Sequence, residues 1–207
     1  MTKSVLFGTC QLCSERKSKA AMVGHLKRCL PASTDSDGSF SQVLLLRVQA
    51  GARMFWLDLM TTPEGKLGDI DGLLRGIWLE CCGHLSEFYA GAHHKIGMST
   101  KVGDAFALIG NRLDYIYDFG SSTELVVSFS GFAKANSGSP VQLVARNEPP
   151  TWLCDVCRQA ATSVCVQCYE GGFCCAEHAD SHHCGEEMLL PVVNSPRMGV
   201  CGYTGEA

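Results

Sequence analysis

The densest feature of the sequence is a run of cysteine and histidine between Cys154 and Cys184. These thirty-one residues contain seven cysteines and three histidines, most of them in closely spaced pairs. Such pairs supply zinc ligands two at a time, because one tight turn directs both side chains toward one ion. A segment this short cannot bury a core of its own, so metal binding stabilises it instead. The sequence therefore predicts a module in residues 151–190 that is stabilised by bound metal ions.

The order of the pairs predicts two interleaved zinc sites. The first and third pairs form one site, and the second and fourth form the other. The ligands assigned in this way are Cys154, Cys157, Cys175 and His178 for one ion, and Cys165, Cys168, His182 and Cys184 for the other. Cys174, His183 and Cys201 stay open as alternatives. Eleven candidate ligands lie beyond residue 150, which is enough for two four-coordinate ions and too few for three.

The ligand types favour structural zinc over other metal chemistry. An iron–sulfur cluster uses four cysteines, whereas histidines at finger spacing indicate zinc. Catalytic zinc keeps an open coordination position, and sulfur-rich surroundings of this kind are typical of closed sites.

A further array near the N-terminus predicts a zinc finger in residues 1–30. Its ligands are Cys10, Cys13, His25 and Cys29. His25 and Cys29 are four residues apart, so a helix over 22–29 places both on one face. With the two sites of the tail, the sequence predicts three zinc ions per chain.

Charge is divided unevenly along the chain. Residues 1–30 hold six basic side chains against one acidic one, whereas residues 151–207 hold two basic against seven acidic. This asymmetry predicts a protein partner for the acidic end, with nucleic acid as a partner for the basic finger. We find no secretory signal and no apolar run long enough to span a membrane, and we expect a cytoplasmic protein in which cysteines bind metal rather than pair as disulfides.

The central part of the chain has the pattern of an α+β domain. A Ser-, Asp- and Gly-rich linker at 31–41 precedes it, and Pro149-Pro150 follows it. Strands are predicted over 42–50, 54–60, 84–91, 112–120, 123–132 and 141–147, with one main helix over 67–79. This order predicts a mostly antiparallel sheet with the helix on one face, spanning 42–147. Residues 191–207 form a C-terminal extension.

Two resemblances follow from these motifs. Residues 42–147 resemble the plasmid open-reading-frame-three-like family, also met as a passenger protein of insertion elements. The motifs that carry this resemblance are Phe55-Trp56, Leu67-Gly68-Asp69-Ile70, His84-Leu85-Ser86-Glu87-Phe88 and Tyr115-Ile116-Tyr117-Asp118-Phe119-Gly120. The resemblance implies a compact α+β domain and a link to mobile DNA.

Residues 154–184 resemble a B-box zinc finger, which implies a two-zinc module for protein–protein contact or self-association.

No motif of a known reaction is present, and the function hypothesis is correspondingly a binding one. The chain has no GxxxxGK[ST], GxGxxG, GxSxG or HExxH pattern. Cys81 and Cys82 are interpreted as unmodified buried thiols at the end of the helix. We expect a zinc-binding, non-catalytic adaptor or regulatory protein. The alternative is an enzyme of unknown reaction whose site contains His84, Glu87 and Asp118.

Overall fold

The computed structural model describes residues 5–33, 41–50, 54–91, 94–136, 138–168 and 171–205. The chain forms two compact units. Unit 1 comprises Met1–Leu74 and Leu85–Glu148, and unit 2 comprises Arg75–His84 and Pro149–Ala207. The predicted finger 1–30 and the predicted domain 42–147 therefore fall mainly in one unit, and the short segment 75–84 belongs with the tail. Most of the predicted linker 31–41 lies outside the described residues.

Unit 1 is built on a nine-stranded sheet with every described pairing antiparallel, which confirms the α+β class. The order is β2-β1-β9-β4-β3-β8-β7-β5-β6. The strands are β1 (Phe7–Cys10), β2 (Arg16–Ser18), β3 (Ser41–Ala50), β4 (Phe55–Thr61), β5 (Ser86–Ala90), β6 (His94–Ile96), β7 (Arg112–Tyr117), β8 (Thr123–Ala135) and β9 (Val141–Asn147).

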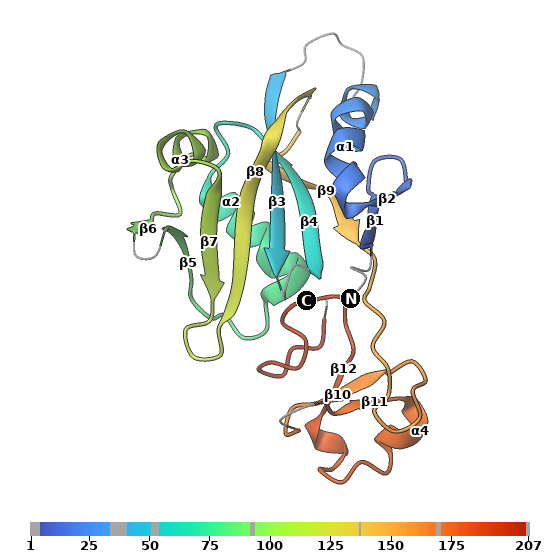
Figure 1. Ribbon diagram of the computed structural model, residues 1–207. Coiled ribbons are helices and arrows are strands. Elements are labelled where there is room, and N and C mark those ends of the chain that lie inside the picture. The colour runs from blue at the N-terminus through green and yellow to red at the C-terminus, as the bar shows by residue number, and fades with distance from the viewer. Residues whose placement is uncertain are drawn as a thin grey trace. The chain divides into compact units, whose positions relative to one another are not determined.

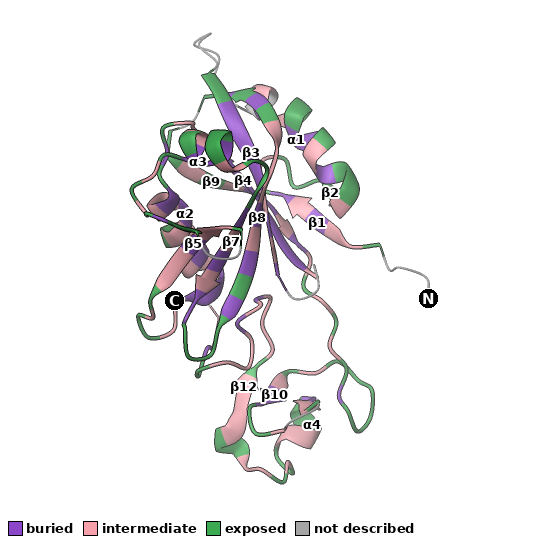
Figure 2. Cartoon of the chain, turned by 60° about the vertical axis from the view of Figure 1, so that its left-hand side comes forward, coloured by how far each residue is buried: buried purple, intermediate pink, exposed green. Residues whose placement is uncertain are grey.

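The middle of this sheet is buried on both faces. All seven residues of β4 are buried, and four consecutive residues of β3 from Val43 to Leu46 are buried as well. Because successive side chains of a strand point to opposite faces, such runs require cover on both sides. Helix α1 (Lys19–Ser33) lies on one side, and α2 (Leu67–Leu74) and α3 (Val102–Ile109) lie on the other (Figures 1 and 2).

Helix α1 joins the N-terminal segment to the core of unit 1. Its residues Met22, Leu26 and Leu30 are buried at a spacing of four, so they form one apolar stripe. This stripe packs in a cluster with residues of β3, β4, β8 and β9, including Leu45 and Trp56. Strand β1 also pairs with β9 through Gly8 opposite Asn147. The finger is therefore an extension of the sheet, closed by its own helix.

Several elements differ from the sequence expectation in ways that local pattern does not reveal. The helix predicted over 67–79 is α2 followed by a π-helical turn, η1 (Arg75–Leu79). Helix α3 and strand β6 were not predicted. The eight residues of α3 include Gly103, which weakens a helix, and packing of Val102, Ala105 and Phe106 stabilises it.

Unit 2 has little regular structure. Its three-stranded sheet has the order β11-β10-β12, with β10 (Ser163–Cys165), β11 (Phe173–Cys174) and β12 (Leu189–Pro191). Helix α4 (Ala176–Ala179), the 3-10 turn η2 (Glu186–Met188) and the π-helical turn η1 also belong to it. The rings of Trp152 and Phe173 stack at 4.6 Å between centroids, which anchors the start of the tail to this sheet.

Candidate metal centres

Among its described residues, the structure gathers cysteine and histidine into four groups that could hold a metal ion. Each group consists of three cysteines and one histidine, and its ligand atoms all lie within 4.8 Å of one another. Centre 1 is Cys10, Cys13, His25 and Cys29; centre 2 is Cys154, Cys157, Cys175 and His178; centre 3 is Cys165, Cys168, His182 and Cys184; centre 4 is Cys81, Cys82, His84 and Cys201. Centres 1 to 3 group the same twelve residues that the spacing predicts as ligands. Centre 4 was not predicted.

The distances inside the groups fit one ion among four ligands and exclude disulfides. Zinc bonds of about 2.3 Å to sulfur and about 2.0–2.1 Å to nitrogen, at a tetrahedral angle, separate two sulfurs by about 3.8 Å and sulfur from nitrogen by about 3.6 Å. The Sγ atoms of Cys10 and Cys29 are 4.0 Å apart, and those of Cys168 and Cys184 are 3.9 Å apart. None of the thirteen cysteines forms a disulfide.

Centre 1 lies between the β1–β2 hairpin and α1. Cys10 and Cys13 occupy a tight turn in which Ser14 N–H donates to the Cys10 carbonyl at 2.9 Å, and Ser14 takes a left-handed φ of 61°. Helix α1 supplies the other two ligands from successive turns. His25 directs Nε2 to Cys13 Sγ at 3.3 Å, and its Nδ1 faces a Glu15 carboxylate oxygen at 3.7 Å. A carboxylate on the second ring nitrogen is a common support for a metal-bound histidine.

Centre 2 repeats the turn of centre 1. Arg158 N–H donates to the Cys154 carbonyl at 2.9 Å, and Arg158 has a φ of 63°. Backbone N–H groups of Cys157 and then Cys175 donate to Cys154, and they lower the pKa of its thiol to about 6. Because a hydrogen bond to a thiolate favours the charged form, the turn prepares the sulfur for a cation. His178 reaches Cys175 Sγ through Nδ1 at 3.2 Å.

Centre 3 groups His182 and Cys184 with the Cys165–Cys168 pair and leaves out two of the alternatives that the sequence left open. His182 Nε2 lies 3.5 Å from Cys168 Sγ, whereas His183 belongs to no group. Cys174 is also outside the groups, and its Sγ lies 3.6 Å from His182 Nδ1, the other ring nitrogen. Gly172 has a φ of 88°, and a Cβ there would come within 2.8 Å of the Cβ of Cys168. Glycine is therefore required where β11 approaches this turn.

Centre 4 joins two segments of unit 2 that are far apart in sequence. Cys81, Cys82 and His84 follow η1, and Cys201 comes from the C-terminal loop 117 residues beyond His84. The interpretation of Cys81 and Cys82 as buried thiols is corrected, because Cys81 is only partly buried and Cys82 is exposed. Both belong to this group. Two signals were available in the sequence: the close set Cys81-Cys82-Gly83-His84, and the Val-Cys-Gly context of Cys201, which resembles half a zinc knuckle.

The residues of the enzyme alternative are engaged in other contacts. His84 belongs to unit 2 and directs Nε2 at Cys82 Sγ, at 3.0 Å. Glu87 in unit 1 pairs with Lys95 and accepts a hydrogen bond from Tyr89 Oη at 2.5 Å, and these two contacts hold the pKa of its carboxyl below the usual range. A general base near neutral pH needs the opposite shift. Asp118 accepts a hydrogen bond from Gly120 N–H at 2.9 Å, and this contact stabilises the turn that contains both residues.

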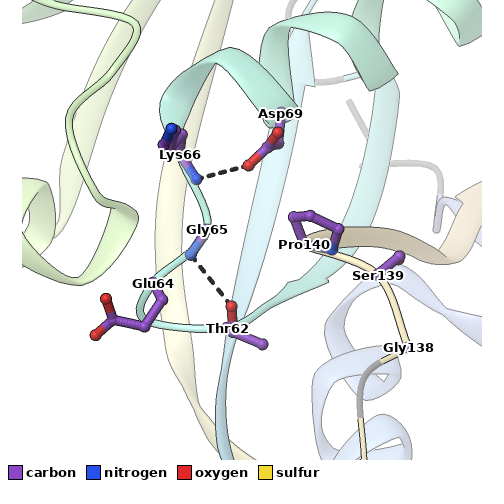
Figure 3. Close-up of a pocket in the computed structure, with 8 residues that line it drawn as sticks. All are labelled: Thr62, Glu64, Gly65, Lys66, Asp69, Gly138, Ser139 and Pro140. Carbon is purple, nitrogen blue, oxygen red and sulfur yellow. Dashed lines mark hydrogen bonds between the residues drawn. The ribbon is translucent and has the colours of Figure 1, made fainter.

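A polar hollow of about 510 Å³ opens on unit 1 beside the start of α2 (Figure 3). Its lining residues are Thr62, Glu64, Gly65, Lys66, Asp69, Gly138, Ser139 and Pro140. The dashed lines in Figure 3 show two contacts of a capped turn: Gly65 N–H donates to Thr62 Oγ1, and Lys66 N–H donates to Asp69 Oδ2. The lining contains no sulfur or imidazole, and these local hydrogen bonds define a helix start.

Comparison with known proteins identifies no family for this chain. No protein-family model matches the sequence, and no curated protein matches it. A crystal structure of a protein of unknown function from Methanosarcina mazei Go1 aligns with 52% of this chain and 68% of its own, at 17% identity and a TM-score of 0.42. Among the described residues, no helix is long and apolar enough to cross a membrane.

Proposed function

We propose that this chain is a zinc-stabilised, non-catalytic binding protein that acts as an adaptor or regulator. The observation that carries the proposal is the grouping of four candidate protein ligands in each of centres 1, 2 and 3. Four protein ligands leave no coordination position for a substrate or an activated water, as is typical of structural zinc. Three thiolates with one imidazole suit zinc and lack the fourth sulfur that an iron–sulfur cluster uses.

The binding surface we propose lies on the two cysteine turns of unit 2. Val156, in the middle of the Cys154–Cys157 turn, is 69% exposed, and Val166, in the Cys165–Cys168 turn, is 45% exposed. Exposed apolar side chains on metal-fixed turns offer rigid contacts to a partner at little entropic cost. The tail is also acidic, so the partner we propose is a protein with a basic, partly apolar surface. The B-box resemblance of residues 154–184 supports the same role.

The wider setting we propose is cytoplasmic and connected with mobile DNA. Thirteen cysteines without a disulfide suit a reducing compartment. The resemblance of residues 42–147 to the plasmid open-reading-frame-three-like family supports the connection with mobile elements.

Nucleic acid is a second candidate partner, at the N-terminal finger. Lys27 and Arg28 are exposed on α1. Two neighbouring cations are already engaged, because Lys17 pairs with Glu15 at 2.6 Å and Arg16 pairs with Glu148. The free positive charge is therefore smaller than the sequence count suggests, and the protein partner remains the first candidate.

Paired substitutions test the protein-binding surface. Partners crosslinked to the zinc-loaded chain in cells would be purified and titrated against it by calorimetry. We expect Val156→Asp with Val166→Asp to weaken binding by roughly tenfold or more, as for central interface contacts, with the zinc content unchanged. Val5→Asp is the matched control, because Val5 is equally apolar and 65% exposed in unit 1. Equal affinity of both variants for every partner would remove the tail from the proposal.

A charge-reversal series tests the second candidate. Lys17, Lys19, Lys27 and Arg28 are changed to Glu, and affinity for single- and double-stranded DNA and RNA is measured between about 50 and 200 mM salt. If the finger binds nucleic acid, the affinity falls with salt in the unaltered chain and is lost in the variant. Salt-independent or undetectable binding of the unaltered chain excludes this candidate.

A further inference from the structure

The ligands of centre 4 are presented by a braced loop. The π-helical turn η1 closes with Glu80 N–H donating to the Arg75 carbonyl at 2.9 Å. Arg75 also donates to a Glu80 carboxylate oxygen at 2.7 Å and to the His84 carbonyl at 2.6 Å. Gly83 N–H donates to Glu80 at 2.6 Å, and Gly83 has a φ of 77°, which turns the chain back on itself. The bend places Cys82 and His84 together.

The C-terminal loop is attached to this segment by buried polar contacts. Ser195 Oγ donates to the Trp78 carbonyl at 2.6 Å and accepts from Arg197 N–H at 2.9 Å. Ser195, Arg197 and Trp78 are all essentially inaccessible to solvent. A helix end leaves carbonyls without helical partners, and Ser195 satisfies one of them. The loop that carries Cys201 is therefore held to η1 by contacts that involve none of the four candidate ligands.

The four ligand atoms enclose a position of the size of a metal ion. Cys82 Sγ lies 3.7 Å from Cys81 Sγ and 3.6 Å from Cys201 Sγ, close to the sulfur separation around tetrahedral zinc. His84 Nε2 lies 3.2 Å from Cys201 Sγ. A disulfide requires about 2.05 Å between sulfurs, so neither pair of cysteines is joined. The group has the same composition, three cysteines and one histidine, as centres 1 to 3.

Charge supplies an independent indication. The buried Arg197 directs Nη2 at Cys81 Sγ, at 3.7 Å. A cation removed from water is stabilised by a nearby negative charge. Three thiolates, a neutral imidazole and a divalent ion together carry one net negative charge, whereas protonated thiols carry none. The metal-bound form of centre 4 therefore complements Arg197 electrostatically, as outer hydrogen-bond donors do at metal sites.

From these observations we propose that Cys81, Cys82, His84 and Cys201 bind a fourth zinc ion, which clips the C-terminal loop to η1. This goes beyond the three structural ions of the proposed function. The clip connects the two chain segments of unit 2, residues 75–84 and 149–207, which are separated in sequence by residues 85–148 of unit 1. It gives the C-terminal loop, which has no helix or strand of its own in the described residues 192–205, a fixed position.

Native mass spectrometry of the full zinc-loaded chain tests the proposal by counting ions. We expect four ions per chain, and three in each of the variants Cys201→Ser and His84→Ala. Cys174→Ser is the matched control, because it removes a cysteine that belongs to no centre, and it is expected to retain four. A count of three in the unaltered chain that Cys201→Ser leaves unchanged overturns centre 4 and leaves the other three intact. Four ions in Cys201→Ser also overturn it.

Thiol labelling of the unaltered chain tests the same point where a variant fails to fold. Cys201 is exposed, so an unligated thiol at this position reacts readily with N-ethylmaleimide. We expect Cys201 to react at least roughly tenfold more slowly until a chelator is added, since a metal-bound thiolate is a weaker nucleophile. Immediate labelling overturns the proposal, as does a Cys82–Cys201 disulfide found in the zinc-loaded protein.

Limited proteolysis measures whether centre 4 holds the C-terminal loop in place. Arg197 is buried in the folded chain, so trypsin reaches it only when the loop opens. We expect cleavage after Arg197 to be roughly tenfold faster or more in Cys201→Ser than in Cys174→Ser. Equal rates in the two variants would contradict a role of centre 4 in holding the loop.

Discussion

In centre 2 the pKa values of the Cys154 and Cys175 thiols are lowered and that of Cys157 is raised, whereas in centre 4 the pKa of the Cys82 thiol is raised. Backbone N–H groups lower the pKa of Cys154 in centre 2 to about 6. In centre 4, the thiols of Cys201 and Cys81 raise the pKa of Cys82 to about 12. The Cys154 sulfur accepts hydrogen bonds from backbone N–H groups, whereas the Cys82 sulfur is surrounded by other thiols. The groups around each sulfur therefore set how strongly protons compete with a metal ion for it.

This difference predicts an order of metal loss on acidification. A thiol with a lowered pKa remains a thiolate to lower pH, so fewer protons compete for it at any given pH. A thiol with a raised pKa is protonated sooner as the pH falls. Centre 4 should therefore release its ion before centre 2 as the pH is lowered from about 8 to about 5. Native mass spectrometry across this range, with Cys201→Ser to identify the centre 4 ion, measures the order, and earlier loss from centre 2 would contradict it.

Helix α1 has two roles at the scale of the element. One face supplies His25 and Cys29 to centre 1, and the adjoining stripe of Met22, Leu26 and Leu30 packs on the sheet. Leu26 directly follows a ligand in sequence and is fully buried. Core packing and ligand placement are therefore coupled through one rigid helix.

Truncation of Leu26 tests this coupling. Leu26→Ala should lower the free energy of unfolding of unit 1 by about 2–5 kcal/mol, through lost burial and the cavity left behind. It should also weaken metal retention at centre 1, because the helix that carries His25 and Cys29 loses part of its packing against the sheet. Arg28→Ala, at an exposed position of the same helix, is the control and should change both by little. Urea unfolding measures the change in stability, and chelator competition measures metal retention. A Leu26→Ala variant with unchanged stability and unchanged metal retention would show that centre 1 alone holds the helix in place.

Elements specified by local pattern were predictable, and those specified by long-range contacts were not. Strands β3 and β4 and the helix carrying His25 were predicted, because apolar runs and a spacing of four residues are visible in the sequence. The interleaving of centres 2 and 3 was visible too, since their ligands come in spaced pairs. Centre 4 combines the adjacent Cys81 and Cys82 with a single distant cysteine, and no spacing rule connects them. Its formation depends on Ser195 meeting Trp78, which is a tertiary contact.

The two units differ in what stabilises them. Of forty buried apolar residues in the described chain, thirty-two belong to unit 1 and eight to unit 2. Three of those eight, Cys154, Cys165 and Cys175, are themselves members of centres 2 and 3. Unit 2 therefore has almost no apolar core apart from its candidate ligands, whereas unit 1 has a sheet covered on both faces. Metal removal should consequently affect the units unequally.

Chelation should unfold unit 2 and leave the sheet of unit 1 folded. Structural zinc contributes about 10–16 kcal/mol in finger peptides, which matches or exceeds the total stability of about 5–15 kcal/mol of an ordinary domain. Unit 2 has few buried apolar residues to offset that loss, whereas the pairing of β3 with β8 does not involve a ligand residue.

Hydrogen exchange with and without chelator measures the outcome. Amides of β10, β11 and β12 should exchange roughly a hundredfold faster or more after metal removal, and those of β3 and β8 should change far less. Adding zinc back should restore protection in unit 2, which controls for irreversible damage. Protection that persists in β10 after complete metal removal would show that unit 2 folds without its ions, and the role of the centres would then have to lie in binding rather than in stability.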